Sequence, residues 1–238
     1  NPDINNQMNA TPDSVTPGPH GPLVLPGTYT LKLIVDGKAY SQTVVVHNDP
    51  RIGESASMMA ALRAQNKLAM AAWNGMTDTS TGNDEVTAVR TQLAAITKGT
   101  LPADVAAAAK DLDTKMTTFG GAVVQGGRGG GFGGAPRAPG SLLAFRAINT
   151  TFYTVLGPLS QNGIDMPPTP AMIHTWESGC KELSATATAW KTMLGADLVA
   201  FNSLLSKNNL TPLKLTPTAV MAPASCIFVG PARTAARK

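Results

Sequence analysis

The chain has 238 residues, of which 14% are charged, and its formal net charge is +4. Its basic residues are scattered, which excludes the clustered basic face that a nucleic-acid-binding protein needs. No run approaches the ~20 apolar residues that a membrane span requires. Few charges together with abundant Thr, Ala, Asn and Gly favour an exported or assembly-embedded protein. Because the chain begins with Asn1 rather than Met, we expect a processed or truncated product.

The first 50 residues are predicted to hold the β-structure of the chain. Residues 1–25 should be irregular, because their five prolines exclude a central strand or helix. Residues 29–35 and 39–46 are rich in β-branched and aromatic side chains, which favours two strands. Between them, Asp36-Gly37 is a strong signal for a tight hairpin turn.

One face of this hairpin should be buried. Leu31, Leu33 and Val35 lie at every second position, which places them on the same side of a strand. A lone hairpin is marginal in water at best, so it must lie on further structure. Either the N-terminal segment adds a short edge strand, or the remaining strands belong to another stretch of polypeptide.

After Asp49-Pro50 the spacing of the apolar residues changes from two to 3.6, which predicts helices. Gly75 and the polar run 77–82 should end the first helix, and Asn83 or Asp84 should cap the second. Pro102 is expected in the first turn of the third helix. The expected ranges are 54–75, 83–99 and 100–119.

A glycine-rich loop is predicted over 120–140. Ser141 is then expected to cap a helix. Thr169 as N-cap and Pro170 at the first helical position should begin the longest helix, which reaches about Lys207. Its apolar residues step by three and four almost throughout, which is typical of a packed helical bundle.

The tail, residues 213–238, is rich in proline and contains one apolar cluster at 226–229. The two cysteines, Cys180 and Cys226, allow at most one intramolecular disulfide, a natural pairing in an exported protein. It would close a loop of about 45 residues and contribute ~3–4 kcal/mol on the chain-entropy model. The alternative is two free, buried thiols.

Several short motifs together resemble a known family. The motifs are Pro26-Gly27-Thr28-Tyr29-Thr30, Asp36-Gly37-Lys38, Asp49-Pro50-Arg51, Pro168-Thr169-Pro170 and Leu210-Thr211-Pro212-Leu213. In this order they resemble the C-terminal region of secreted bacterial β-propeller proteins with BNR repeats, which are sortilin-like and often labelled glycosyl hydrolases. The resemblance implies that the hairpin supplies the last strands of an immunoglobulin-like domain and that a helical region follows. It also implies that the propeller, with any catalytic residue of the family, lies outside this chain.

Other motifs do not predict a chemical site. Glycines 129, 131 and 134 have GxGxxG spacing, but they follow a predicted helix rather than a strand, which indicates a linker rather than a phosphate-binding loop. His20, His47 and His174 have no metal-ligand spacing with one another or with cysteine. Trp176 and Trp190 lie on the apolar stripe of the longest helix, which favours a core role over a carbohydrate platform. We expect no cofactor and no metal.

The sequence therefore predicts a mainly α fold with a small β part: a hairpin of an incomplete immunoglobulin-like sheet, then an antiparallel helical bundle. The expected divisions are 1–50, 51–212 and 213–238. The favoured function is a non-catalytic structural or interaction module of an exported β-propeller protein. It would dock on the propeller or on partner subunits in an extracellular, cell-surface or periplasmic setting. The alternatives are an accessory part of a glycoside hydrolase and a carbohydrate- or peptide-binding module.

Overall fold

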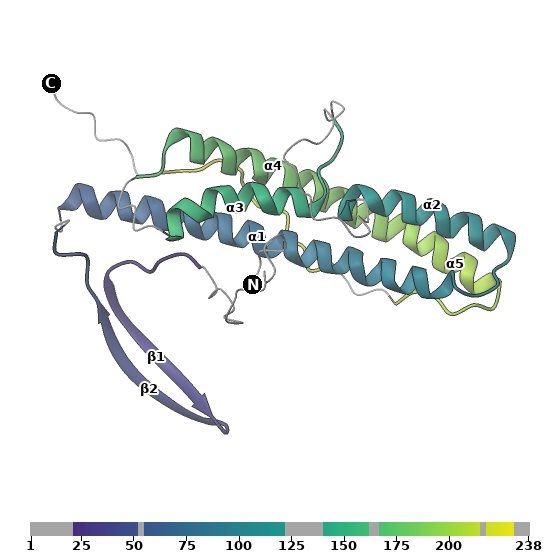
Figure 1. Ribbon diagram of the computed structural model, residues 1–238, viewed down its shortest axis with the longest axis horizontal. Coiled ribbons are helices and arrows are strands. Elements are labelled where there is room, and N and C mark those ends of the chain that lie inside the picture. The colour runs from purple at the N-terminus through teal and green to yellow at the C-terminus, as the bar shows by residue number, and fades with distance from the viewer. Residues whose placement is uncertain (1–20, 52–54, 122–139, 162–166, 215–217, 231–238) are drawn as a thin grey trace, which may run out of the picture.

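The computed structural model describes residues 21–51, 55–121, 140–161, 167–214 and 218–230. It is mainly helical with one two-stranded antiparallel sheet, as the sequence predicts (Figure 1). The glycine-rich loop 122–139 and the start of the chain, residues 1–20, lie outside the described residues. The elements in chain order are β1 (Gly27–Val35), β2 (Lys38–Val46), α1 (Ala56–Ile96), α2 (Ala103–Gly120), α3 (Phe145–Gln161), α4 (Pro170–Met193), the π-helical turn η1 (Leu194–Leu198) and α5 (Val199–Lys207).

The 41-residue helix α1 corrects the prediction of two helices separated by a break at 77–82. Ser55 caps α1, and its hydroxyl accepts a hydrogen bond from the Met58 amide at 3.2 Å. The threonines of the polar run do not break the helix, because Thr77 and Thr81 donate their hydroxyls to carbonyls one turn earlier. Such local bonds satisfy the hydroxyl inside a helix.

Gly75 and Gly82 are contact positions for another helix. A Cβ on Gly75 would lie 2.5 Å from the Phe152 ring, and one on Gly82 would lie 2.7 Å from the Phe145 ring. Both glycines and both phenylalanines are separated by seven residues, which is about two helical turns. The pairing is crossed, so α3 runs antiparallel to α1. Each glycine therefore admits an aromatic ring that any larger residue would exclude.

A buried polar contact lies between these two aromatic contacts and fixes the same α1–α3 interface. Asn149 of α3 is fully buried, and its amide nitrogen donates to the Thr79 hydroxyl at 2.9 Å and the Met76 carbonyl at 3.1 Å. Thr79 is also fully buried and donates to helix carbonyls of α1. Because a mispaired buried amide is costly, this contact sets the register of α3 along α1.

The bundle is built along α1. Helices α3 and α2 lie one after the other beside it, and α4 continues through η1 into α5 on the same side (Figure 1). Thr169 caps α4 with Pro170 next to it, as predicted, whereas α3 begins at Phe145 rather than directly after Ser141. The turn η1 departs from the predicted spacing of three and four residues between apolar positions. The buried residues there, Met193 and Leu198, are five apart. A π turn accommodates one extra residue in this way.

The hairpin extends away from the bundle (Figure 1). Its register pairs Leu33 with Tyr40, and the turn has positive φ at Asp36 (49°) and Gly37 (79°). The expectation that one face is buried is wrong for the described residues. Leu31 is 59% exposed and Leu33 63% exposed, since no helix reaches them. The hydrophobic core is built from the helices and Leu213, and it includes no residue of the hairpin.

Candidate functional site

The first candidate surface is the apolar face of the hairpin. Residues opposite each other in an antiparallel pair point to the same side, so the register decides which side chains gather. One side carries Tyr29, Leu31, Leu33, Val35, Tyr40, Val44 and Val46, together with Lys38 and Gln42. The other side is mostly Thr, Ser, Lys and Ala. We call the first side the hairpin face. Apolar and polar sides alternate along the hairpin as in a half-buried sheet, yet the hairpin face is largely exposed in this structure.

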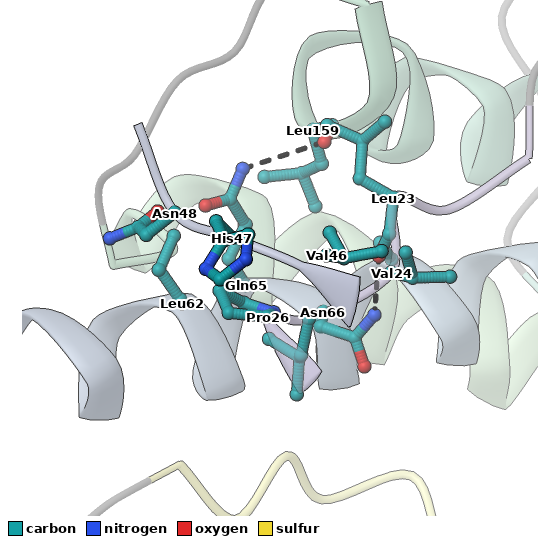
Figure 2. Close-up of a pocket in the computed structure, with 12 residues that line it drawn as sticks. Leu23, Val24, Pro26, Val46, His47, Asn48, Leu62, Gln65, Asn66 and Leu159 are labelled. Atoms are coloured by element: carbon teal, nitrogen blue, oxygen red, sulfur yellow. Dashed lines mark hydrogen bonds between the residues drawn. The ribbon is translucent and has the colours of Figure 1, made fainter. Parts of the chain in front are cut away.

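The base of the hairpin is anchored to α1, as Figure 2 shows. The Asn66 amide donates to the Leu23 carbonyl at 2.7 Å, and the Tyr29 hydroxyl donates to the Leu25 carbonyl at 2.6 Å. Gln65 donates across to the Leu159 carbonyl of α3 at 3.4 Å. Leu23, Leu25, Gln65, Asn66 and Leu159 line a small cavity of about 100 Å³ between the hairpin base and the bundle. The hairpin is therefore held at its base and free along its length.

Asp49 and Arg51 form the joint between β2 and α1. The Asp49 carboxylate accepts the Arg51 backbone amide at 2.9 Å and its guanidinium Nε at 3.0 Å. The side-chain bond to Arg51, and then the backbone bond, lower the pKa of Asp49. This closed turn directs the chain from strand to helix through a local bond between residues two apart.

The second candidate surface surrounds the disulfide. The structure joins Cys180 to Cys226 with 5.4 Å between their Cα atoms, and it describes no free cysteine. Cys180 is fully buried on α4. Residues 218–230, which we call the strap, carry Cys226 and run back along the bundle from the α5 end toward the start of α4 (Figure 1). Of the apolar cluster 226–229, Cys226 and Phe228 pack against the core, whereas Ile227 and Val229 are exposed.

Helix α1 holds the strap through a stripe of polar side chains. The Glu85 carboxylate accepts the Thr218 hydroxyl at 2.8 Å, the Ala219 amide at 2.7 Å and the Trp190 indole N–H at 2.7 Å. Two turns later, Gln92 binds the segment before the strap: it accepts the Lys214 amide at 2.8 Å and donates to the Lys214 carbonyl at 3.4 Å. Most of these bonds reach backbone groups, so they depend little on the sequence that they hold.

The far end of the strap is held by an aromatic contact. Phe228 packs edge-on against Trp176 with ring centroids 6.1 Å apart, and its amide donates to Glu177 Oε1 at 3.0 Å. Lys67 donates to the Val229 carbonyl at 2.9 Å, and its ammonium lies 5.8 Å from the Phe228 ring centroid. Charged and aromatic groups from two helices thus converge on two residues of the strap, Phe228 and Val229.

Between these anchors a cavity of about 240 Å³ lies under the strap. Its walls come from α1, α3, α4 and the strap itself, and include Phe152, Trp176 and Met221. Asp78 lines it too; burial raises the pKa of this carboxyl, and a hydrogen bond from the Met221 backbone opposes the rise. The indole N–H of Trp176 is buried without a hydrogen-bond partner among the described residues.

The chemical motifs considered from sequence do not converge. His174 is exposed on α4 and His47 lies at the hairpin base, while His20 and the GxGxxG glycines fall outside the described residues. Within the described part of the chain, no three His, Cys, Asp or Glu residues gather to hold a metal ion. Trp176 and Trp190 are buried, so neither forms an open carbohydrate platform. No described helix is long and apolar enough to cross a membrane.

The spacing of four polar residues along the sequence of α1 could have predicted the strap contacts. The residues that hold the strap and the segment before it are spaced by 11, 7 and 7 along α1: Lys67, Asp78, Glu85 and Gln92. Steps of seven and eleven both return to nearly the same side of an α-helix. The prediction of a break at 77–82 divided this stripe between two helices and concealed it.

Comparison of the chain with protein-family models, with curated proteins and with solved structures gave no match. The site must therefore be interpreted from its own geometry.

Proposed function

We propose that this chain is a non-catalytic structural and interaction module whose hairpin completes a β-sheet with strands from a β-rich domain of its parent or partner protein. The observation that carries the proposal is the hairpin face. Its apolar side chains follow the period of a half-buried strand, yet Leu31, Leu33 and Tyr40 are more than half exposed. A contiguous apolar face of this kind is typical of an interaction surface.

The hairpin is suited to completion by other strands. Two strands alone are marginal in water, and both outer edges of this pair lack a strand partner among the described residues. The anchored base fixes where the hairpin leaves the bundle, so a docking domain would meet it in a defined orientation. The bundle meanwhile contains its own core and does not need the hairpin.

The resemblance to sortilin-like β-propeller proteins names the class of parent: an exported protein whose immunoglobulin-like domain lacks these last strands. The Cys180–Cys226 disulfide supports an extracellular, cell-surface or periplasmic location, because disulfides persist mainly in oxidising compartments. The partners would be the propeller portion of the parent or sister subunits. Any glycosidase chemistry of the parent would reside in that portion.

Site-specific photo-crosslinking tests the proposal. A photoreactive phenylalanine analogue is placed at position 33, on the hairpin face, and in a matched variant at position 41, on the opposite side. After irradiation in the exported fraction of producing cells, crosslinked peptides are identified by mass spectrometry. We expect position 33 to crosslink to alternate residues in the strands of one β-rich polypeptide, and position 41 to give few products.

Equal labelling from both positions, or crosslinks from position 33 to many unrelated proteins, would contradict the proposal. Crosslinks from position 33 to the helices of the same chain would show instead that the hairpin folds back onto its own bundle. Circular dichroism of both variants checks that the helices are intact before either result is interpreted.

The open edges also favour a second candidate, strand addition by an extended peptide. Backbone groups on the outer side of each strand can pair with an added strand. This candidate predicts crosslinks from the edges of β1 or β2 to a single extended segment, without a second sheet facing Leu33.

A further inference from the structure

The cavity under the strap plays no part in the proposed sheet completion. Its volume is about 240 Å³, and its apolar walls include Phe152 of α3, Cys180 of the disulfide and two residues of the strap, Met221 and Pro223. A cavity of about 150 Å³ in a packed protein core is large enough to hold benzene. The cavity under the strap therefore has room for one substituted ring of roughly ten non-hydrogen atoms.

The wall from α4 supplies a buried hydrogen-bond donor. Trp176 lines the cavity and is 8% exposed, and its indole N–H is buried without a hydrogen-bond partner among the described residues. The other buried indole of α4 is paired, because the N–H of Trp190 donates to Glu85 at 2.7 Å. Folded proteins pair almost all buried polar groups, since an unpaired one loses its hydrogen bonds to water without replacement. The Trp176 indole therefore calls for an acceptor in the cavity that it lines.

The wall from α1 supplies an acceptor. Asp78 lines the cavity, and its carboxylate accepts the Met221 backbone amide. A carboxylate has about four acceptor positions, so Asp78 can accept further hydrogen bonds. Burial raises the pKa of this carboxyl, which is a common property of carboxyl groups in binding sites. A donor and an acceptor thus line one apolar cavity from two different helices.

These two groups select the polar group of a ligand. An ammonium group has donors only, so it would leave the Trp176 indole N–H unpaired. A carboxylate has acceptors only and would lie beside the negative charge of Asp78. No lysine or arginine among the described residues lines the cavity to offset that charge. A hydroxyl group accepts one hydrogen bond and donates another, so it satisfies both walls with a single oxygen atom.

We propose that the cavity under the strap binds a small, uncharged ring compound that carries a hydroxyl group, such as a phenol or a cyclic alcohol. Its oxygen accepts a hydrogen bond from the Trp176 indole and donates one to Asp78, while its ring contacts Phe152 and Met221. Apolar cavities with a few convergent polar groups are the usual form of small-molecule sites. This function is separate from that of the hairpin face, which lies outside the cavity.

Nuclear magnetic resonance of the indole N–H groups tests the proposal on the unaltered, oxidised chain. The chain has three tryptophans, so three indole signals report on separate places in the fold. 4-Methylphenol is the probe, and its dissociation constant is expected at about 0.1–1 mM, as for other ligands of this size. We expect the Trp176 proton signal to move downfield and saturate, while the Trp190 signal, already bonded to Glu85, stays in place. No saturable shift, or equal shifts of all three signals, would overturn the proposal.

1,4-Dimethylbenzene is the matched ligand, because it replaces the hydroxyl of 4-methylphenol by a methyl group of similar size. We expect it to bind about fivefold more weakly, since it leaves the indole N–H unpaired. Trp176→Phe removes the N–H and keeps an aromatic ring. In this variant 4-methylphenol should lose about fivefold in affinity, measured by saturation transfer to the ligand, and 1,4-dimethylbenzene should lose none. Equal losses for the two ligands would show that the hydroxyl is not recognised.

Filling the cavity locates the bound ring. Ala71 lines the cavity and is half-buried, so Ala71→Leu should lower the affinity for 4-methylphenol at least tenfold. Ala94→Leu, at an exposed position of the same helix outside the cavity, is the control and should leave the affinity unchanged. Circular dichroism confirms that both variants keep their helices. Full affinity in Ala71→Leu would place the ligand elsewhere and refute the site.

Discussion

The hairpin and the α1–α3 interface both carry clear apolar patterns, but only one of them is buried. In the hairpin, Leu33 faces Tyr40 across the strand pair and both side chains remain exposed. At the interface, Phe145 and Phe152 contact glycines of α1 and are almost completely buried. The difference shows that a period in the sequence specifies which residues share a face, whereas burial requires a partner of matching shape.

The two regions also differ in how they are anchored. The interface combines shape with a buried polar contact, Asn149 to Thr79, which fixes its register. The hairpin is held at its base, where the Asn66 amide donates to the Leu23 carbonyl. We therefore expect substitutions in the bundle to change the free energy of unfolding and substitutions on the hairpin face to change association.

The largest effect is expected for Trp190→Ala. Trp190 is fully buried, lies against Phe119 with ring centroids 5.2 Å apart, and donates to Glu85. Loss of the ring should destabilise the chain by about 3–5 kcal/mol in urea unfolding followed by circular dichroism. Tyr40→Ala on the hairpin face, where the side chain is 57% exposed, should cost less than about 0.5 kcal/mol. Similar losses of unfolding free energy for the two variants would contradict the distinction between a buried bundle and an exposed hairpin face.

Cys226→Ser should have the next largest effect. The disulfide closes a loop with a sequence separation of 46 residues, so its loss should lower the free energy of unfolding by about 3–4 kcal/mol on the chain-entropy model. Reduction of the unaltered chain should produce the same loss, and the variant should then be insensitive to reductant. A variant as stable as the oxidised, unaltered chain would show that the disulfide adds nothing to the stability of the bundle.

Gly82→Ala tests the shape of the α1–α3 contact. The added Cβ would lie 2.7 Å from the Phe145 ring, so we expect a destabilisation of about 1–3 kcal/mol. Gly195→Ala in η1 is the matched control, since nothing lies within 4 Å of its Cβ. There the higher helix propensity of alanine should stabilise the chain by about 0.5–1 kcal/mol. Opposite signs in thermal unfolding would confirm that the Gly82 contact depends on close approach.

Leu33→Lys should leave the bundle unchanged while altering the hairpin face. The side chain is 63% exposed, so the free energy of unfolding should change by less than about 0.5 kcal/mol. Binding of a hydrophobic fluorescent dye, and any self-association seen by light scattering, should fall. Lys32→Leu on the opposite side is the reciprocal change. If the dye signal is unaffected by Leu33→Lys, the hairpin face is not the accessible apolar surface of the molecule.

The smallest effect is expected from Asp78. Burial raises the pKa of this carboxyl above its ordinary value of 3.8, so the folded chain holds the proton more tightly than the unfolded chain. Its contribution to stability is complete below the unfolded-state pKa and is lost as pH rises through the folded-state pKa. Asp78→Asn keeps an oxygen for the Met221 amide and should flatten the pH dependence above about pH 3.8. Parallel stability–pH curves would contradict this assignment.

Several elements were predictable because their signals are local. The Asp36-Gly37 turn, the strands on either side of it, and the cap of α4 at Thr169 depend on neighbouring residues only. The helix over 100–119 was predicted for the same reason, and Val105, Leu112, Met116 and Phe119 of α2 are buried. For the strap, the sequence supplied the two cysteines but left open whether they pair.

The errors arose where a local signal was outweighed by packing. Gly75 and the polar run after it are helix-ending signals in isolation. Helix α1 nevertheless continues, because Gly75, Gly82 and Thr79 form the surface against which α3 packs. The turn η1 likewise follows from packing, since no residue of 194–198 alone specifies a π turn. The strap contacts were missed because Lys67, Asp78 and Glu85 of α1 were assigned to one helix, to a break and to a second helix.

The sequence by itself determined which residues would form strands and most of the helices, because propensity, capping and period act over a few neighbouring positions. The tertiary structure decided that α1 is one helix, that the strap lies on Glu85 and Trp176, and that the hairpin face is left open. These features depend on contacts between residues far apart in the chain. Their energy comes from the shape and polarity of a facing surface, which no local pattern contains.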